Sequence, residues 1–134
     1  MLIHPCVSFI IVKDNCILLE HRSLNKATDA GAIAIPGGHI ETDECHITAL
    51  RREVKEELDI EITQQHYLCS LYHPSGELQL LHYYVVNQWQ GEIKSLEADS
   101  VNWYPLTPDS AQLEADKLAI SEYLRVNHIL SINE

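Results

Sequence analysis

Residues 36–60, PGGHIETDECHITALRREVKEELDI, contain three glutamates whose spacing guides the rest of the interpretation. Glu53, Glu56 and Glu57 lie at i, i+3 and i+4, so a helix would place their carboxylates on one side. Like charges at these spacings destabilise a helix by about 0.2–0.5 kcal/mol per pair, and the C-terminal end of the helix dipole also disfavours anions. This cost indicates a compensating role, because clustered carboxylate oxygens are the ligands that a hard cation such as Mg²⁺ prefers. A solvated acidic helix face is the alternative interpretation.

The residues around these glutamates follow a longer pattern. Residues 38–60 resemble the signature of the Nudix hydrolase family, G-x5-E-x7-R-E-U-x-E-E-x-G-U, in which U is aliphatic. The matching positions are Gly38, Glu44, Arg52, Glu53, Val54, Glu56, Glu57 and Ile60. Asp59 is the one departure, since it occupies the position of the second glycine. Aspartate tolerates the left-handed conformation that often ends a helix, but here it adds a negative charge next to Glu56 and Glu57.

The pattern of apolar and turn residues predicts strands and two helices. We expect strands over residues 5–12, 16–20, 32–35, 60–72, 78–86 and 100–106, with helices over about 43–58 and within 108–128. Thr42 or Asp43 is the expected N-cap of the first helix, and residues 88–99 are expected to form a polar connection. Gly37 and Gly38 form either a simple turn or a close approach of the backbone to a ligand. This order predicts the α/β class with a mixed sheet, and the resemblance implies an α/β/α sandwich, the Nudix fold, with a mixed central β-sheet.

Apolar residues at helical spacing predict the buried face of each helix. The first helix has Ile47, Leu50, Val54 and Leu58 at intervals of three or four residues, which would fix the direction of the neighbouring acids. For the second helix we expect a buried face made of Leu113, Ala115, Leu118, Ala119, Tyr123 and Leu124.

The composition is that of a globular protein with one domain. The sequence has 134 residues, of which 46% are hydrophobic and 22% charged, and we expect a single Nudix hydrolase domain over 1–134. No apolar run approaches the ~20 residues of a membrane span, and the first residues lack the features of a signal peptide. The four cysteines form no C-x-x-C pair, which favours reduced, buried thiols, and the eight histidines lack a metal-ligand spacing such as H-E-x-x-H. We therefore expect a cytoplasmic protein that has no membrane partner and whose histidines are ordinary surface or core residues.

The net charge of −11, from 20 acidic and 9 basic residues, limits the classes of substrate. Binding of a nucleic acid polymer needs clustered Lys and Arg, so we expect no such partner. A small phosphorylated molecule fits only if metal ions neutralise the acidic site. The charge balance and the glutamate cluster therefore indicate the same cofactor.

The resemblance also implies an activity. It indicates a hydrolase, dependent on Mg²⁺ or on Mn²⁺ in its place, that cleaves a nucleoside triphosphate to the monophosphate and pyrophosphate. Residues 82–93, HYYVVNQWQGEI, resemble the MutT-like branch, which favours this reading. One alternative is hydrolysis of another nucleoside diphosphate derivative such as ADP-ribose or a nucleotide sugar, for which Pro74 is a weak indication. A non-catalytic nucleotide-binding module is a further alternative, and the resemblance leaves open whether the protein is a monomer or a homodimer.

The site residues implied by the resemblance fall into three groups. The metal ligands are the carbonyl oxygen of Gly37 and the carboxylates of Glu53, Glu56, Glu57 and Glu97. The catalytic group contains Glu53 as the candidate base and Glu97 as another base, and Asp99 could take the place of Glu97. Arg52 is its orienting residue, and a simple surface ion pair is the alternative for Arg52. The substrate-binding group contains Arg22 at a phosphate, Gly38 at the backbone approach and Asp116 at the base.

Overall fold

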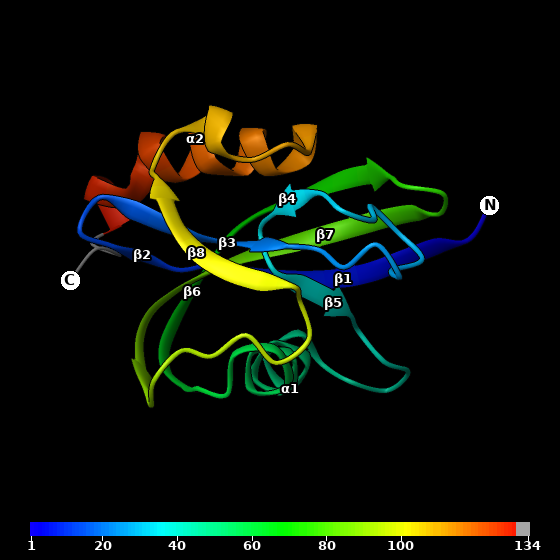
Figure 1. Ribbon diagram of the computed structural model, residues 1–134, viewed down its shortest axis with the longest axis horizontal. Helices are drawn as coiled ribbons and strands as arrows, with labels where there is room; N and C mark the ends of the chain where they lie inside the picture. The colour runs from blue at the N-terminus through cyan, green and yellow to red at the C-terminus, as the bar shows by residue number, and fades with distance from the viewer. Residues whose placement is uncertain (131–134) are drawn as a thin grey trace.

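Two helices lie on opposite sides of a layer of strands (Figure 1). This computed structural model describes residues 1–130. The elements are β1 (Ile3–Ile10), β2 (Val12–Lys13), β3 (Cys16–His21), β4 (Ile33–Ala34), β5 (Gly37–His39), α1 (His46–Leu58), β6 (Glu61–Pro74), β7 (Leu78–Gln90), β8 (Ser100–Pro105), the 3₁₀ turn η1 (Pro108–Ser110) and α2 (Glu114–Leu130). The expected α/β/α arrangement is therefore confirmed.

The strands divide into two sheets. The first has the order β5-β1-β7-β6, in which β1 and β7 run parallel and the other pairs are antiparallel. In the second, β3 pairs antiparallel with β2, β4 and β8. The expected mixed sheet is thus present, although it is accompanied by a smaller antiparallel sheet.

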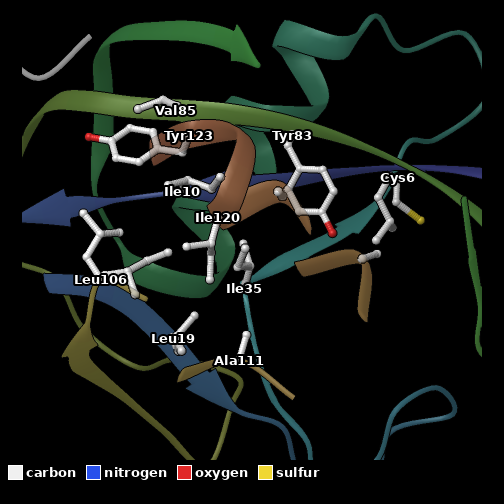
Figure 2. Packing of buried hydrophobic residues seen from close by; sticks show 14 residues of the cluster. Cys6, Ile10, Leu19, Ile35, Tyr83, Val85, Leu106, Ala111, Ile120 and Tyr123 are labelled. Carbon is white, nitrogen blue, oxygen red and sulfur yellow. The ribbon is translucent and has the colours of Figure 1, made fainter. Parts of the chain in front are cut away.

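Strand β1 is buried on both faces, which explains why the sequence near the N-terminus is almost continuously apolar. Val7 and Phe9 pack in the cluster that contains the buried face of α1, whereas Cys6 and Ile10 pack in the cluster of α2. Successive side chains of a strand point to opposite faces, so a strand covered by helices on both sides needs apolar residues at every position. Figure 2 shows part of the α2 cluster, with Ile10 close to Ile120.

The start of the first helix differs from the prediction. Helix α1 begins at His46, and its N-cap is Cys45, whose side chain makes no capping hydrogen bond. Thr42 and Asp43 are therefore not the N-cap. Asp43 has a φ of 67°, in the left-handed region, so the right-handed helix cannot include it. The predicted C-terminus is confirmed, since Asp59 caps the helix with φ 58° and ψ 37°.

Several other boundaries also move. Residue 11 separates β1 from β2, β6 and β7 extend beyond the predicted strands, and η1 precedes α2. Strand β7 includes residues 88–90 of the expected polar connection. Gly37 and Gly38 belong to β5 and not to a turn, and neither has a positive φ.

The buried face of α2 was predicted only in part. Ala115, Ala119 and Tyr123 are buried, but Leu118 and Leu124 are 57% and 41% exposed. Ile120 completes the buried stripe, because the face that meets the strands follows the i, i+4, i+5, i+8 positions from Ala115. No helix within residues 1–130 is long and apolar enough to cross a membrane.

Candidate active site

The backbone of β5 lies directly against the C-terminal half of α1. A Cβ atom added to Gly38 would overlap the Glu53 carboxylate, and one added to Gly37 would overlap the carbonyl oxygen of Val7. Glycine at position 38 therefore allows a helix carboxylate to approach the strand backbone closely. Both glycines lie in β5, so the turn interpretation is wrong. The close approach seen here is to protein atoms, and an approach of this backbone to a ligand stays a prediction.

The three glutamates of α1 have different environments. Glu53 and Glu57 are buried, at 9% and 6% exposure, whereas Glu56 is exposed. The buried apolar residues of the helix are Ala49, Leu50, Val54 and Leu58, so packing of that face turns Glu53 and Glu57 inward. The exposed-face alternative therefore describes Glu56 but not the other two.

Arg52 connects the acidic residues. Its Nε and Nη2 atoms donate to Glu44 Oε2 and Oε1 at 2.7 and 2.8 Å, and Nη1 donates to Glu53 Oε1 at 2.9 Å. Weaker contacts reach Glu56 Oε2 at 3.3 Å and the carbonyl oxygen of His39 at 3.0 Å. The Arg52 hydrogen bonds, followed by the hydrogen bond from the Glu41 backbone N–H, lower the pKa of Glu44 to about 2. The expected orienting contacts are present, but Glu44 and Glu53 are closer to the guanidinium than Glu56.

Glu57 is a buried acid without a full set of partners. Among the described residues, nothing donates a hydrogen bond to its buried Oε2. Burial, followed by the charges of Glu20, Glu53 and Glu97, raises the pKa of Glu57 to about 10. Burial also raises the pKa of Glu53, against the opposing effect of Arg52. An unpaired buried oxygen near other carboxylates is the environment that a divalent cation would stabilise, so the residues fit such an ion.

Strand β3 adds one acid that the sequence analysis missed. Glu20 is 3% exposed and accepts a hydrogen bond from Arg22 Nη1 at 3.0 Å, and burial raises its pKa. An acid at the end of the apolar run CILLE was the available signal. Arg22 also donates from Nη2 to the carbonyl oxygen of Thr28 at 2.9 Å, which holds the loop after β3.

The loop between β7 and β8 brings Glu97 towards α1. The backbone N–H of Leu96 donates to the carbonyl oxygen of Glu57 at 3.0 Å, and Lys26 Nζ lies 3.8 Å from Glu97 Oε2. Lys26 is a second residue that sequence reasoning did not identify. Asp99, the substitute for Glu97, does not line the cavity described next.

One cavity of about 530 Å³ is lined by every residue of the three predicted groups except the substitute Asp99. Those residues are Arg22, Gly37, Gly38, Arg52, Glu53, Glu56, Glu57, Glu97 and Asp116. The residues come from the loop after β3, β5, α1, the loop before β8 and α2, so the tertiary fold assembles a set that is scattered in the sequence.

Asp116 is the most buried acid of this set, with 1% exposure. Its Oδ1 accepts from the Tyr83 hydroxyl at 2.7 Å, and its Oδ2 accepts from the backbone N–H of Ile35 at 3.0 Å. Burial raises the pKa of Asp116 to about 6, although both hydrogen bonds lower it. Each carboxylate oxygen has a further lone pair, so Asp116 can accept from a ligand in addition to holding Tyr83 and Ile35.

Comparison with known proteins identifies the family of the chain. The family model of the NUDIX domain matches residues 2–123. The CTP pyrophosphohydrolase of Escherichia coli (strain K12) is 36% identical over 119 residues, covering 81% of this chain and 87% of that protein. The 8-oxo-dGTP diphosphatase of Proteus vulgaris is 30% identical over 92 residues, covering 68% and 81%.

A solved structure shows the same fold. The crystal structure of a MutT Nudix hydrolase from Burkholderia pseudomallei has a TM-score of 0.81 and 27% identity, covering 91% of this chain and 98% of the other. The family match, the two relatives and this structure agree with the signature of residues 38–60. The chain therefore belongs to the Nudix hydrolase family, is similar to its MutT-like members, and is an enzyme of that family.

Proposed function

We propose that this Nudix hydrolase is a Mg²⁺-dependent pyrophosphohydrolase that cleaves a nucleoside triphosphate to the monophosphate and pyrophosphate. The observation that carries the proposal is Glu57, whose buried Oε2 lacks a hydrogen-bond donor within the described residues and whose pKa is raised by burial and by three other acids. Because an unpaired buried carboxylate costs stability, its presence at this position supports a role that requires it. Mn²⁺ is proposed as a substitute ion.

The metal ligands in this proposal are the carbonyl oxygen of Gly37 and the carboxylates of Glu53, Glu56, Glu57 and Glu97. All five residues line the same cavity. When bound, Mg²⁺ supplies neutralisation of the phosphate oxygens, which otherwise repel both the acidic site and the attacking water.

Arg52 and Glu53 are the proposed catalytic pair. Arg52 binds Glu53 Oε1, so Oε2 is the oxygen that we assign as acceptor of a proton from the attacking water. Burial raises the pKa of Glu53, which makes it a stronger base than an exposed glutamate. Glu97, on the more exposed loop, is the alternative base.

Substrate binding is proposed at two parts of the cavity. Besides Arg52, the cavity is lined by the basic residues Arg22 and Lys26, and we assign Arg22 to a phosphate group. Gly38, which lines the cavity, is assigned to the substrate through its backbone at β5, because the Glu53 carboxylate occupies the space where a side chain would be. Asp116 is assigned to the base, where a carboxylate oxygen can accept from an exocyclic amino group. The similarity to a CTP pyrophosphohydrolase supports a base of this kind.

The ADP-ribose or nucleotide-sugar alternative has less support. Pro74 ends β6 directly before the turn to β7 and does not line the cavity. A proline in that position is explained by the hairpin alone. The intact glutamates of α1 also favour an enzyme over a nucleotide-binding module.

The remaining assignments concern the cellular setting. We propose that the enzyme acts in the cytoplasm on a small molecule, as a monomer or homodimer. All four cysteines are free, as expected for a reducing compartment, although Cys45 is exposed and only Cys6 is fully buried. The net charge of −11 supports the absence of a nucleic acid polymer as partner.

The experiment is a hydrolysis panel with Mg²⁺, containing CTP, 8-oxo-dGTP, other nucleoside triphosphates, ADP-ribose and a nucleotide sugar. Products are separated by chromatography, and the reaction is repeated in ¹⁸O-water to locate the attacked phosphorus. We expect monophosphate and pyrophosphate from one or a few triphosphates, and turnover at least ~100-fold slower in Glu57→Gln. Faster cleavage of ADP-ribose than of every triphosphate, or ¹⁸O only in orthophosphate, would overturn the proposal.

A further inference from the structure

Three side chains with metal-ligating atoms meet at one end of the larger sheet. His4 is on β1, His39 is on β5, and Glu77 immediately precedes β7. One ligand atom from each lies within 4.8 Å of the other two. His39 Nε2 contacts Glu77 Oε2, and His4 Nε2 lies 3.9 Å from Glu77 Oε1. Their positions in the sequence are too far apart for a motif to reveal this cluster.

The register of the sheet explains why these residues share a face. His39 pairs with Cys6 on β1, and His4 lies two residues before Cys6. His4 in turn pairs with Gln79 on β7, and Glu77 lies two residues before Gln79. Paired residues of adjacent strands, and residues two apart on one strand, point to the same side. Strands β1 and β5, and the start of β7 directly after Glu77, therefore hold the cluster through their backbone hydrogen bonds.

Further contacts fix the orientation of the cluster. Gln79 Nε2 donates to Glu77 Oε2 at 2.9 Å, and Arg52 Nη2 donates to the carbonyl oxygen of His39 at 3.0 Å. The side chains of His4, His39 and Glu77 remain 33%, 52% and 25% exposed, so an ion and a water molecule can reach them. An outer hydrogen bond to a ligating carboxylate is the support that metal sites commonly use.

We propose that His4, His39 and Glu77 form a second cation site, which takes Zn²⁺ and is chemically distinct from the carboxylate site of α1. Two imidazoles and one carboxylate, with an open fourth position for water, are a ligand set that suits Zn²⁺. Mg²⁺ prefers oxygen ligands and is not expected there.

The ligand atoms lie within 4.8 Å of one another, so small side-chain rotations that also open the direct His39–Glu77 contact would bring them around one ion. Ligand atoms around tetrahedral zinc lie about 3.3 Å apart, given zinc–ligand bonds of about 2.0 Å. The His4–Glu77 separation of 3.9 Å needs only a small side-chain rotation to reach that value. His39 and Glu77 also line the cavity, so a Zn²⁺ ion at the cluster would add positive charge to the cavity wall.

The test measures Zn²⁺ binding without nucleotide, so it is independent of the proposed hydrolysis. The imidazole nitrogens of the full-length protein are followed by NMR during addition of ZnCl₂ at about pH 7.5, because metal binding depends on pH and the pH must be held constant. Saturating Mg²⁺ is present throughout, and calorimetry gives the affinity. The variants are His4→Ala, His39→Ala and Glu77→Gln, with circular dichroism to check folding. His128→Ala, at an exposed histidine on α2, is the matched control.

We expect the signals of His4 and His39 to shift together at one equivalent of bound ion. His4→Ala and His39→Ala should each weaken this event by at least ~100-fold, because loss of a ligand costs more than the ~10–100-fold that is typical for an outer partner. Glu57→Gln and His128→Ala should keep this Zn²⁺ binding, which would show that it occurs at the cluster and not at the carboxylate site. Unchanged imidazole signals of His4 and His39, or equal Zn²⁺ affinity in His4→Ala and His128→Ala, would show that the cluster is only an ion pair at the strand ends.

Discussion

Arg52 donates two hydrogen bonds to Glu44, from Nε to Oε2 at 2.7 Å and from Nη2 to Oε1 at 2.8 Å. Glu44 precedes α1, so this pair ties the helix to the segment before it. The pairing leaves Nη1 for Glu53, at 2.9 Å. Glu44 therefore positions Arg52, and Arg52 positions the proposed base.

The first prediction follows from this chain of contacts. Glu44→Gln replaces one acceptor oxygen with a donor, so Arg52 should lose its fixed orientation. We expect kcat to fall roughly 10–100-fold with KM little changed, as for other outer partners of a reactive centre. Glu122→Gln is the matched control, because Glu122 accepts two similar bonds from Arg125 on α2, at 2.8 and 2.9 Å, away from the cavity. Equal kcat in Glu44→Gln and the control would contradict the positioning role.

Glu57→Gln should raise the stability of the metal-free protein and lower its activity. The substitution removes a buried ionisable group whose pKa is raised to about 10, so we expect the metal-free protein to gain about 1–3 kcal/mol in unfolding free energy at neutral pH. Turnover should fall at least ~100-fold, because the same carboxylate is a proposed metal ligand. Urea melts in EDTA and steady-state kinetics with Mg²⁺ measure the two effects. Full activity of Glu57→Gln would remove Glu57 from the site.

Gly38→Ala tests the close approach between β5 and α1. The added methyl group would overlap the Glu53 carboxylate, and displacement of a catalytic group by about 1 Å can cost roughly 100-fold in rate. We expect a loss of kcat of that order. Gly76→Ala is the comparison, since its Cβ would meet no atom within 4 Å but its φ of +85° strains an L-residue. That variant should lose about 1 kcal/mol of stability and keep its kcat.

Asp116 should make stability depend on pH. Its pKa is raised from 3.8 to about 6 in the folded protein, so between these values the native state binds more protons than the unfolded state. Unfolding free energy should therefore fall as pH rises through this window, by about 2–3 kcal/mol from this group. His73 and Asp29 are the other charged groups that act on its pKa, in opposite directions.

Tyr83→Phe tests that assignment. The Tyr83 hydroxyl donates to Asp116 and favours its ionised form, so its removal should raise the pKa of Asp116 further. We expect the destabilisation to be larger at about pH 8, at about 2–3 kcal/mol, than at about pH 5. Tyr123→Phe is the control, since the hydroxyl of this buried residue makes no hydrogen bond to a carboxylate within residues 1–130. An equal loss of unfolding free energy in Tyr83→Phe at both pH values would show that the Tyr83 hydroxyl does not affect the ionisation of Asp116.

Asp59, the departure from the family signature, has basic partners. Its Oδ1 lies 3.1 Å from Lys55 Nζ and its Oδ2 lies 3.6 Å from Lys94 Nζ, so its charge is paired despite the nearby glutamates. The hydrogen bond from Lys55, followed by its charge, lowers the pKa of Asp59. Asp59→Asn keeps a residue that tolerates left-handed backbone but loses both ion pairs. We expect a lower Tm at low salt, a smaller difference at high salt, and unchanged kcat. A Tm of Asp59→Asn equal to or higher than that of the unchanged protein at low salt would show that the two ion pairs of Asp59 do not stabilise the fold.

Local features of this protein were determined by the sequence alone. The left-handed conformation of Asp59 at the end of α1 depends on the residue itself and on the helix before it. The helical spacing of Glu53, Glu56 and Glu57, and the buried stripe of Leu50, Val54 and Leu58 beside it, likewise depend on neighbours within one or two turns. These short-range features were sufficient to indicate the family and the side of the helix that carries the site.

The tertiary structure decided how these groups differ in environment. Glu56 is exposed while Glu53 and Glu57 are buried, and the charge of Glu20 on β3 acts on Glu57, which no spacing in the sequence indicates. His4, His39 and Glu77 meet only because the register of β1, β5 and β7 brings them to one face. Burial and long-range pairing arise when distant segments pack, whereas sequence patterns report on the backbone within a few residues.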